Sequence, residues 1–143
     1  FFIDMSWQPY VDRIVSTEHV DKAAILARAD GALVAGSPGF APSADESAGI
    51  AKGISSDYSF PDGITFGGAK YAVIRSIPLG DNHSAVLTMK KKESEDEKAT
   101  GLILTTTNTL VLVAHYDSTE RGYTGVVNDA LSGLADYLVS SGM

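Results

Sequence analysis

The sequence predicts an α+β domain in which a central antiparallel sheet of about six to seven strands carries helices on its faces. Apolar residues recur at three- and four-residue spacing near both ends of the chain, which is typical of amphipathic helices. Between these ends lie short strand-like segments that are separated by glycine, proline and asparagine turns. The elements do not alternate regularly, as those of a parallel βαβ fold do.

The composition allows one ordinary domain and excludes several kinds of chemistry. The chain has 143 residues, of which 44% are hydrophobic, and this is enough for a single core. The absence of cysteine excludes disulfides, thiolate metal sites and cysteine nucleophiles. A net charge of −7 argues against nucleic acid as a main partner. We expect residues 5–143 to form the domain and residues 1–4 to be a native extension or an artificial remnant.

The first predicted element is a short amphipathic helix. Ser6 is placed to act as its N-cap, and Pro9 is tolerated in the first turn because that turn needs no N–H from it. The apolar face consists of residues three and four positions apart, namely Trp7, Tyr10, Val11 and Ile14. Neither an uninterrupted apolar span nor a secretory signal is recognisable, so we expect a cytoplasmic protein.

A hairpin and a second helix are predicted next. The strands cover residues 23–29 and 32–37 and flank Asp30-Gly31, a pair suited to a tight turn. The four residues from Ser43 to Glu46 have the spacing of a capping box, which predicts a helix over residues 44–54.

The second half of the chain is predicted to contain most of the sheet and a closing helix. Acidic residues 93–97 have no apolar period and are expected to form a solvated loop. A stripe at helical spacing, which contains Val127 and Leu138, predicts a helix over residues 125–140 that Gly142 ends. The predicted strands are residues 64–66, 71–75, 85–91, 102–106 and 110–116.

Four motifs, in the same order and at the same spacing, resemble the profilin family. They are residues 6–12 (SWQPYVD), 20–31, 67–75 (GGAKYAVIR) and 135–138. The resemblance implies that the terminal helices pack together on one face of the sheet and that shorter helices cover the other. It also implies a cytoskeleton-associated protein that is no enzyme, takes no cofactor, binds actin monomers and regulates their polymerisation.

The resemblance further implies a groove for proline-rich partners such as formin-type elongation factors. Aromatic rings suit a polyproline helix because they contact its flat faces and donate to its free carbonyls. The residues assigned to this groove are Trp7, Tyr10, Val34, Tyr137, Leu138 and Met143. Many profilins have aromatic residues where this chain has Val34 and Met143, so we expect weak binding. The alternative is that Trp7 and Tyr10 are only core residues of an amphipathic helix.

Actin monomers are expected at the end of the sheet that contains the glycine-lysine segment. The residues assigned by resemblance are Lys70, Val73, Arg75, Lys90, Lys92, Thr100, Tyr123, Gly125, Asn128 and Asp129. They would form a mixed apolar and basic patch on an acidic protein. Asp129 departs from several relatives, which have lysine there. The alternative is that Lys70 and Arg75 are ordinary solvated residues.

Other ligands and functions are disfavoured. Phosphoinositide headgroups would need cations such as Arg75 and residues 90–92, but the acidic residues 93–97 and the net charge oppose them. The pair His115 and Asp117 with nearby Ser118 is the strongest enzymatic suggestion, but no nucleophile elbow is present. The three histidines are too far apart in sequence to indicate a metal site. A scaffold of the same fold that binds proline-rich partners without actin remains the alternative function.

Overall fold

The structure is a computed structural model, and the part of the chain that it describes contains ten helices and strands. The helices are α1 (Gln8–Val15), α2 (Ala44–Ser55) and α3 (Tyr123–Ser140). The strands are β1 (Val20–Ala27), β2 (Leu33–Gly36), β3 (Ile64–Phe66), β4 (Ala69–Gly80), β5 (His83–Lys90), β6 (Thr100–Thr106) and β7 (Leu110–Asp117). The structure describes residues 7–17, 20–80, 83–90, 100–117 and 123–143, and gives only the backbone at residues 80, 89–90, 117 and 123–126.

Seven strands within these residues form a single sheet in the order β2-β1-β7-β6-β5-β4-β3. Every pair of neighbouring strands is antiparallel. Five of the six pairs join strands that are consecutive in the chain, while the β1–β7 pair joins the two halves. The α+β class with an antiparallel sheet, predicted from the irregular order of elements, is confirmed.

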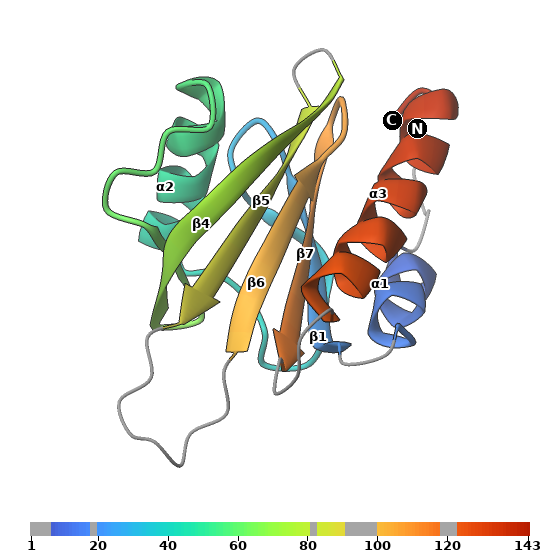
Figure 1. Ribbon diagram of the computed structural model, residues 1–143, viewed down its shortest axis with the longest axis horizontal. Coiled ribbons are helices and arrows are strands. Elements are labelled where there is room, and N and C mark those ends of the chain that lie inside the picture. The colour runs from blue at the N-terminus through green and yellow to red at the C-terminus, as the bar shows by residue number, and fades with distance from the viewer. Residues whose placement is uncertain (1–6, 18–19, 81–82, 91–99, 118–122) are drawn as a thin grey trace.

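The sheet separates two hydrophobic layers. Helices α1 and α3 lie side by side on one face and α2 covers the other (Figure 1). Alternation along β1 feeds both layers, since Ala23 and Ile25 pack with α1 and α3 whereas Ala24 and Leu26 pack with α2. Helix α2 is the described helix on the second face, and its 12 residues lie between the 8 of α1 and the 18 of α3.

Helix α1 begins differently from the prediction. Trp7, rather than Ser6, is the N-cap, and no side chain caps the helix. The Trp7 carbonyl oxygen accepts from the N–H groups of Tyr10 and Val11 at 3.0 and 3.2 Å. Proline in the first turn has no N–H that would require a side-chain cap. Ser6 itself lies outside the described residues.

Helix α2 has the predicted capping box. The Ser43 hydroxyl accepts from the Glu46 N–H at 3.2 Å, and the Glu46 carboxylate accepts from the Ser43 N–H at 2.9 Å. Gly53 is unfavourable for a helix by propensity, but here it makes room for a ring. A Cβ atom at Gly53 would lie 2.1 Å from the ring of Phe60. The helix therefore accepts a glycine so that Phe60 can pack against it.

Strand β4 continues well beyond the predicted end at residue 75. Proline normally terminates an interior strand because it lacks an N–H for the ladder. Strand β3 pairs only with residues 69–71 of β4, so the later part of β4 has a partner on one side only. Pro78 pairs with Ser84 of β5 and is tolerated because its other side needs no donor.

Candidate binding faces

The first candidate surface lies at the end of the sheet where β4 begins and β5 ends. Pairing places Tyr71 of β4 opposite Lys90 of β5, and Thr100 of β6 opposite Asp117 of β7. The first turn of α3 lies near the same end of the molecule (Figure 1). The strand ends and the helix start that carry the residues assigned to actin are therefore neighbours.

Side chains at this end are basic and apolar. Lys70 and Arg75 are exposed, and Val73 is half-buried against the hydrophobic layer between the sheet and α2. Ile74 is 59% exposed, the largest exposed fraction among the described large hydrophobic residues. It is the extra residue of a bulge, because Val73 pairs with Thr88 and Arg75 with Leu87.

Ile74 was missed by sequence reasoning, although the signal was present. Neighbouring residues of a strand point to opposite faces, so Val73 and Ile74 cannot both enter the same core. One member of the pair was bound to be exposed unless a second layer covered it.

Helix α3 contributes Asn128 and Asp129. Asp129 is exposed, while Asn128 is half-buried and its carbonyl oxygen Oδ1 has no hydrogen-bond partner within the described residues. Thr100 is half-buried at the start of β6. For Lys90, Tyr123 and Gly125 only the backbone is described, and Lys92 and the acidic segment 93–97 lie outside the described residues.

The β3–β4 turn leads into this surface and is held by a carboxylate. Glu46 of α2 accepts from the N–H groups of Gly67 and Gly68, each at 3.0 Å. Burial raises the pKa of Glu46, but hydrogen bonds from Ser43, Gly68 and Gly67 lower it more, so its pKa lies below the ordinary value. Glu46 is ionised at neutral pH and fixes the turn from the α2 side.

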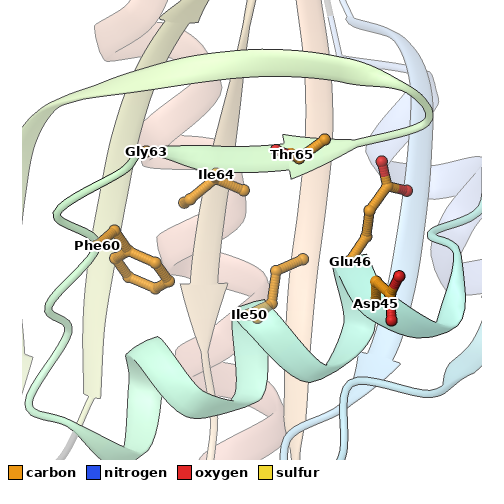
Figure 2. A pocket seen from close by; sticks show the side chains of 8 residues that line it. Asp45, Glu46, Ile50, Phe60, Gly63, Ile64 and Thr65 are labelled. Atoms are coloured by element: carbon orange, nitrogen blue, oxygen red, sulfur yellow. The ribbon is translucent and has the colours of Figure 1, made fainter.

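Beside Glu46, a hollow of about 280 Å³ separates α2 from β3. Asp45 and Glu46 stand at one end of this hollow and Phe60 at the other, as Figure 2 shows. Its residues are Asp45, Glu46, Gly49, Ile50, Phe60, Gly63, Ile64 and Thr65. Nothing in the sequence motifs had indicated this hollow.

His115 has a structural partner that sequence adjacency did not suggest. Its Nδ1 lies 2.6 Å from Oδ1 of Asp21, at the start of β1. The imidazole also makes edge contacts with the rings of Phe40 and Tyr71, with centroids 6.0 and 6.4 Å away. His115 therefore joins β1 and β7 to the α2 layer. The Asp117 side chain and Ser118 lie outside what the structure describes.

The second candidate surface lies where α1 packs beside α3. The rings of Trp7 and Tyr10 are tilted against each other with centroids 5.1 Å apart. Both are half-buried and pack on the core beneath α1 and α3. Tyr137 of α3 is 54% exposed, whereas Leu138 is 2% exposed and belongs to that core. Leu138 supports this surface from below and does not present itself at the surface.

Strand β2 adds two exposed apolar residues. Val34 is 40% and Leu33 46% exposed. Ala35 pairs with Ile25 and Leu33 with Leu26, so Val34 is the extra residue of a bulge. Strand β2 contacts α1, and Ala35 packs on the hydrophobic layer between the sheet and helices α1 and α3, which we call the α1–α3 core. Leu33 was not singled out from the sequence.

Met143 is tied to the β6–β7 turn. Its main-chain oxygen accepts from the hydroxyl and the N–H of Thr109, both at 2.8 Å, and from the hydroxyl of Thr107 at 3.0 Å. The Met143 N–H donates to the Leu138 carbonyl at 2.8 Å, and its side chain packs on the α1–α3 core. Neither Thr107 nor Thr109 was assigned to this surface from the sequence.

Two negative observations concern the described residues. They contain no cluster of three or more His, Cys, Asp or Glu side chains that could hold a metal ion. No helix among them is long and apolar enough to cross a membrane.

Comparison with known proteins agrees with the architecture. The profilin family model matches residues 5–143. Profilin of Schizosaccharomyces pombe is 36% identical over 141 residues, which cover 96% of this chain and 99% of that protein. Profilin of Saccharomyces cerevisiae is 30% identical over 136 residues, with 94% and 97% covered.

Solved structures show the same relationship. Acanthamoeba castellanii profilin IA has a TM-score of 0.73 at 31% identity and covers 96% of this chain and 100% of its own. Mouse profilin IIa, solved in complex with a double repeat from the FH1 domain of mDia1, has a TM-score of 0.74 at 23% identity, with 97% and 100% covered.

A seven-stranded antiparallel sheet with both terminal helices on one face defines the class of this protein as a small α+β domain of profilin type. The chain belongs to the profilin family. Members of this family bind actin and proline-rich sequences, and they are not enzymes. The recognition from four motifs and the prediction that the chain is no enzyme are thus confirmed.

Proposed function

We propose that this protein binds actin monomers at the β4–β5 end of its sheet and proline-rich partners on the α1–α3 face. The observation that carries the proposal is the separation of two chemically different surfaces on one domain. Asn128 and Tyr137 lie nine positions apart on α3, which corresponds to about 13 Å along the helix. One helix therefore contributes to both surfaces, and neither ligand needs to displace the other.

The chemistry of the α1–α3 face favours an extended proline-rich ligand. A polyproline II helix leaves its carbonyls free, and the indole N–H of Trp7 and the hydroxyls of Tyr10 and Tyr137 are suitable donors. Trp7 and Tyr10 are already held against each other, so little ring freedom is lost on binding. These contacts support the binding of proline-rich partners, such as formin-type elongation factors, to this face.

Proline binding is expected to be weak. Val34 and Met143 supply apolar contact but neither ring stacking nor a side-chain donor, and losing aromatic anchors typically costs about 1 to 3 kcal/mol. Titration of oligoproline, followed by the fluorescence of Trp7, the only tryptophan, measures this affinity. We expect a spectral change in the millimolar range and weaker binding in Tyr137→Ala. An unchanged spectrum would refute the groove.

The chemistry of the sheet end favours a partner with an acidic surface. Lys70 and Arg75 provide exposed positive charge on a protein of net charge −7, and Val73 and Ile74 provide apolar area between them. Such charges steer association, and the apolar residues supply the contact that is buried. This combination supports an actin-monomer site.

A charge reversal tests the actin site. Arg75→Glu should weaken actin-monomer binding in a pull-down and reduce the delay in pyrene-actin nucleation. Arg13→Glu, which reverses another exposed arginine, on α1, is the matched control and should retain binding. Equal loss in both variants would indicate a general charge effect instead of a site.

Function would then follow from mass action. Bound actin monomers are kept from spontaneous nucleation. A proline-rich partner that binds the α1–α3 face while actin occupies the sheet end raises the local concentration of actin monomers. The competing function, a scaffold without actin binding, predicts retention on immobilised polyproline and no actin in the bound fraction. Phosphoinositides remain disfavoured, because the cations available in the described part of this surface are Lys70 and Arg75 on an acidic protein.

A further inference from the structure

A single carboxylate connects α2 with the turn between β3 and β4. Oε1 of Glu46 accepts from the Ser43 N–H at 2.9 Å and from the Gly67 N–H at 3.0 Å. Oε2 accepts from the Gly68 N–H at 3.0 Å. Figure 2 shows the side chain rising from α2 toward the end of β3 where this turn begins. Glu46 therefore closes the capping box and holds the hairpin turn at the same time.

The turn depends on an external contact because it has little stiffness of its own. Phe66 pairs with Ala69, so Gly67 and Gly68 alone make the connection. Their φ angles of +62° and +84° are left-handed, as a type I′ hairpin turn requires. A Cβ atom at either position would meet nothing within 4 Å, so conformation and not space demands glycine. Two consecutive glycines are the most flexible residues that a turn can have.

Packing alone does not fix the hairpin either. Strand β3 has only three residues and lies at the edge of the sheet. Ile64 and Phe66 are buried toward α2, but the hollow of about 280 Å³ leaves part of the space between α2 and β3 unfilled. The bonds from Gly67 and Gly68 to Glu46 lie at the turn end of this incompletely packed strand.

We propose that Glu46 is a positioning residue for the partner-binding end of the sheet. It fixes Gly67 and Gly68, and through them the first residues of β4, so that Lys70 is held in one place. The consequence for binding rests on the proposed actin function and deepens it. The consequence for the turn does not depend on that function.

Glu46→Gln separates the two tasks of the side chain. The remaining carbonyl oxygen can still accept from Ser43 and Gly67, so the helix cap is kept. The new amide group would bring its own N–H toward the N–H of Gly68, and two donors cannot bond. Asp45→Asn is the matched control, since Asp45 is an exposed carboxylate of the same helical turn without a hydrogen bond within the described residues.

Amide hydrogen exchange tests the turn directly. In Glu46→Gln the Gly68 amide should exchange about 10-fold faster than in the parent protein. Asp45→Asn should leave it unchanged, and amides of the central strands β1 and β7 should exchange alike in all three proteins. Unchanged exchange at Gly68 in Glu46→Gln would overturn the proposal.

A double-mutant cycle with Lys70→Ala tests the consequence for binding. Glu46→Gln should weaken actin-monomer binding about 5-fold in the parent protein but much less in the Lys70→Ala background, since coupled residues are not additive. Oligoproline affinity should stay unchanged. Equal losses in both backgrounds, or no loss in either, would overturn positioning through Lys70. A parent protein that does not bind actin would refute the proposed function, and the exchange of Gly68 would still decide the role of Glu46.

Discussion

Tyr116 and Thr88, on two strands that β6 separates, are joined by a hydrogen bond of 3.1 Å from the Tyr116 hydroxyl to the Thr88 carbonyl oxygen. The buried Thr88 hydroxyl also donates to the Leu102 carbonyl at 3.0 Å and accepts from its N–H at 3.1 Å. A side chain thus satisfies both main-chain groups of Leu102 on β6. Gly101 lies beside this network, close to both Thr88 and Tyr116.

Gly101 has no room for a side chain. A Cβ atom there would lie 2.3 Å from the Thr88 carbonyl oxygen and 2.7 Å from the Tyr116 hydroxyl. Gly101→Ala should therefore lower the free energy of unfolding by about 2 kcal/mol, as measured by urea denaturation. Gly49→Ala changes an exposed position of α2 beside the hollow, where a Cβ atom would meet nothing within 4 Å, and it should raise the free energy of unfolding by about 0.5 to 1 kcal/mol. Changes of the same sign in both variants would contradict this account.

Glu46 should make stability sensitive to acid. Burial raises its pKa, but the hydrogen bonds from Ser43, Gly68 and Gly67 bring it below 4.5. A lowered pKa in the folded state means that the stabilisation is complete above the unfolded value and is lost as the pH falls through the folded value. At pH 7, Glu46→Gln should cost about 1 kcal/mol, a typical value for one lost hydrogen bond, because the Gly68 N–H loses its acceptor.

The difference between parent and Glu46→Gln should close as the pH falls below 4.5, the ordinary pKa of this group. Urea denaturation of both proteins at neutral and at acid pH measures the difference. Asp45→Asn removes the same charge but no hydrogen bond, so its difference from the parent should be smaller throughout. A gap for Glu46→Gln that stayed constant with pH would show that the carboxylate is not the group that matters.

Tyr71 should make the stability of the fold sensitive to alkaline pH. Burial raises the pKa of the Tyr71 phenol above 10, and the nearby Asp21 carboxylate raises it further. The fold therefore favours the neutral phenol. Its contribution is complete below pH 10 and is lost as the pH rises through the folded-state pKa. The unfolding free energy of the parent should fall more steeply above pH 10 than that of Tyr71→Phe, which keeps the ring but cannot ionise.

The ultraviolet absorbance of tyrosinate measures the ionisation of Tyr71, and urea denaturation measures the free energy of unfolding. Asp21→Asn should move the titration of Tyr71 toward lower pH, because the repelling charge is gone. Identical alkaline loss in the parent and in Tyr71→Phe would rule out Tyr71 as the source of this pH dependence.

Features whose partners are close in sequence could be predicted. The capping box of Ser43 and Glu46 was readable because the two residues are three positions apart, and the stripe of α3 because its period is local. The second task of Glu46 was not readable, because Gly67 is 21 positions away. A strand pairing and a turn conformation must both exist before that bond can form.

The candidate surfaces were predictable to a similar degree. Family motifs named strand ends that the sheet brings together, but not the bulges at Val34 and Ile74, which depend on register with a neighbouring strand. Leu138 was expected in the groove as well as in the apolar stripe of its helix. Only the packing of α3 on the sheet decides whether Leu138 lies in the groove or in the core, and it places Leu138 in the core.

Val34 offers a gain-of-function test of the proposed proline groove. It is 40% exposed on β2, next to Ala35, which packs on the α1–α3 core. Val34→Trp should add a ring and an N–H donor beside the aromatic pair of α1. We expect affinity for a labelled proline-rich peptide, measured by fluorescence anisotropy, to rise about 5-fold, equivalent to about 1 kcal/mol.

Ile74→Trp is the matched control for that gain. It places the same ring on a 59% exposed position of β4, away from α1. Because an exposed tryptophan can bind peptides without specificity, Ile74→Trp should leave the anisotropy titration unchanged if the gain in Val34→Trp comes from the groove. Equal gains in peptide affinity in the two variants would indicate non-specific binding to an exposed tryptophan. No gain in Val34→Trp would mean that β2 does not border the proline-binding surface.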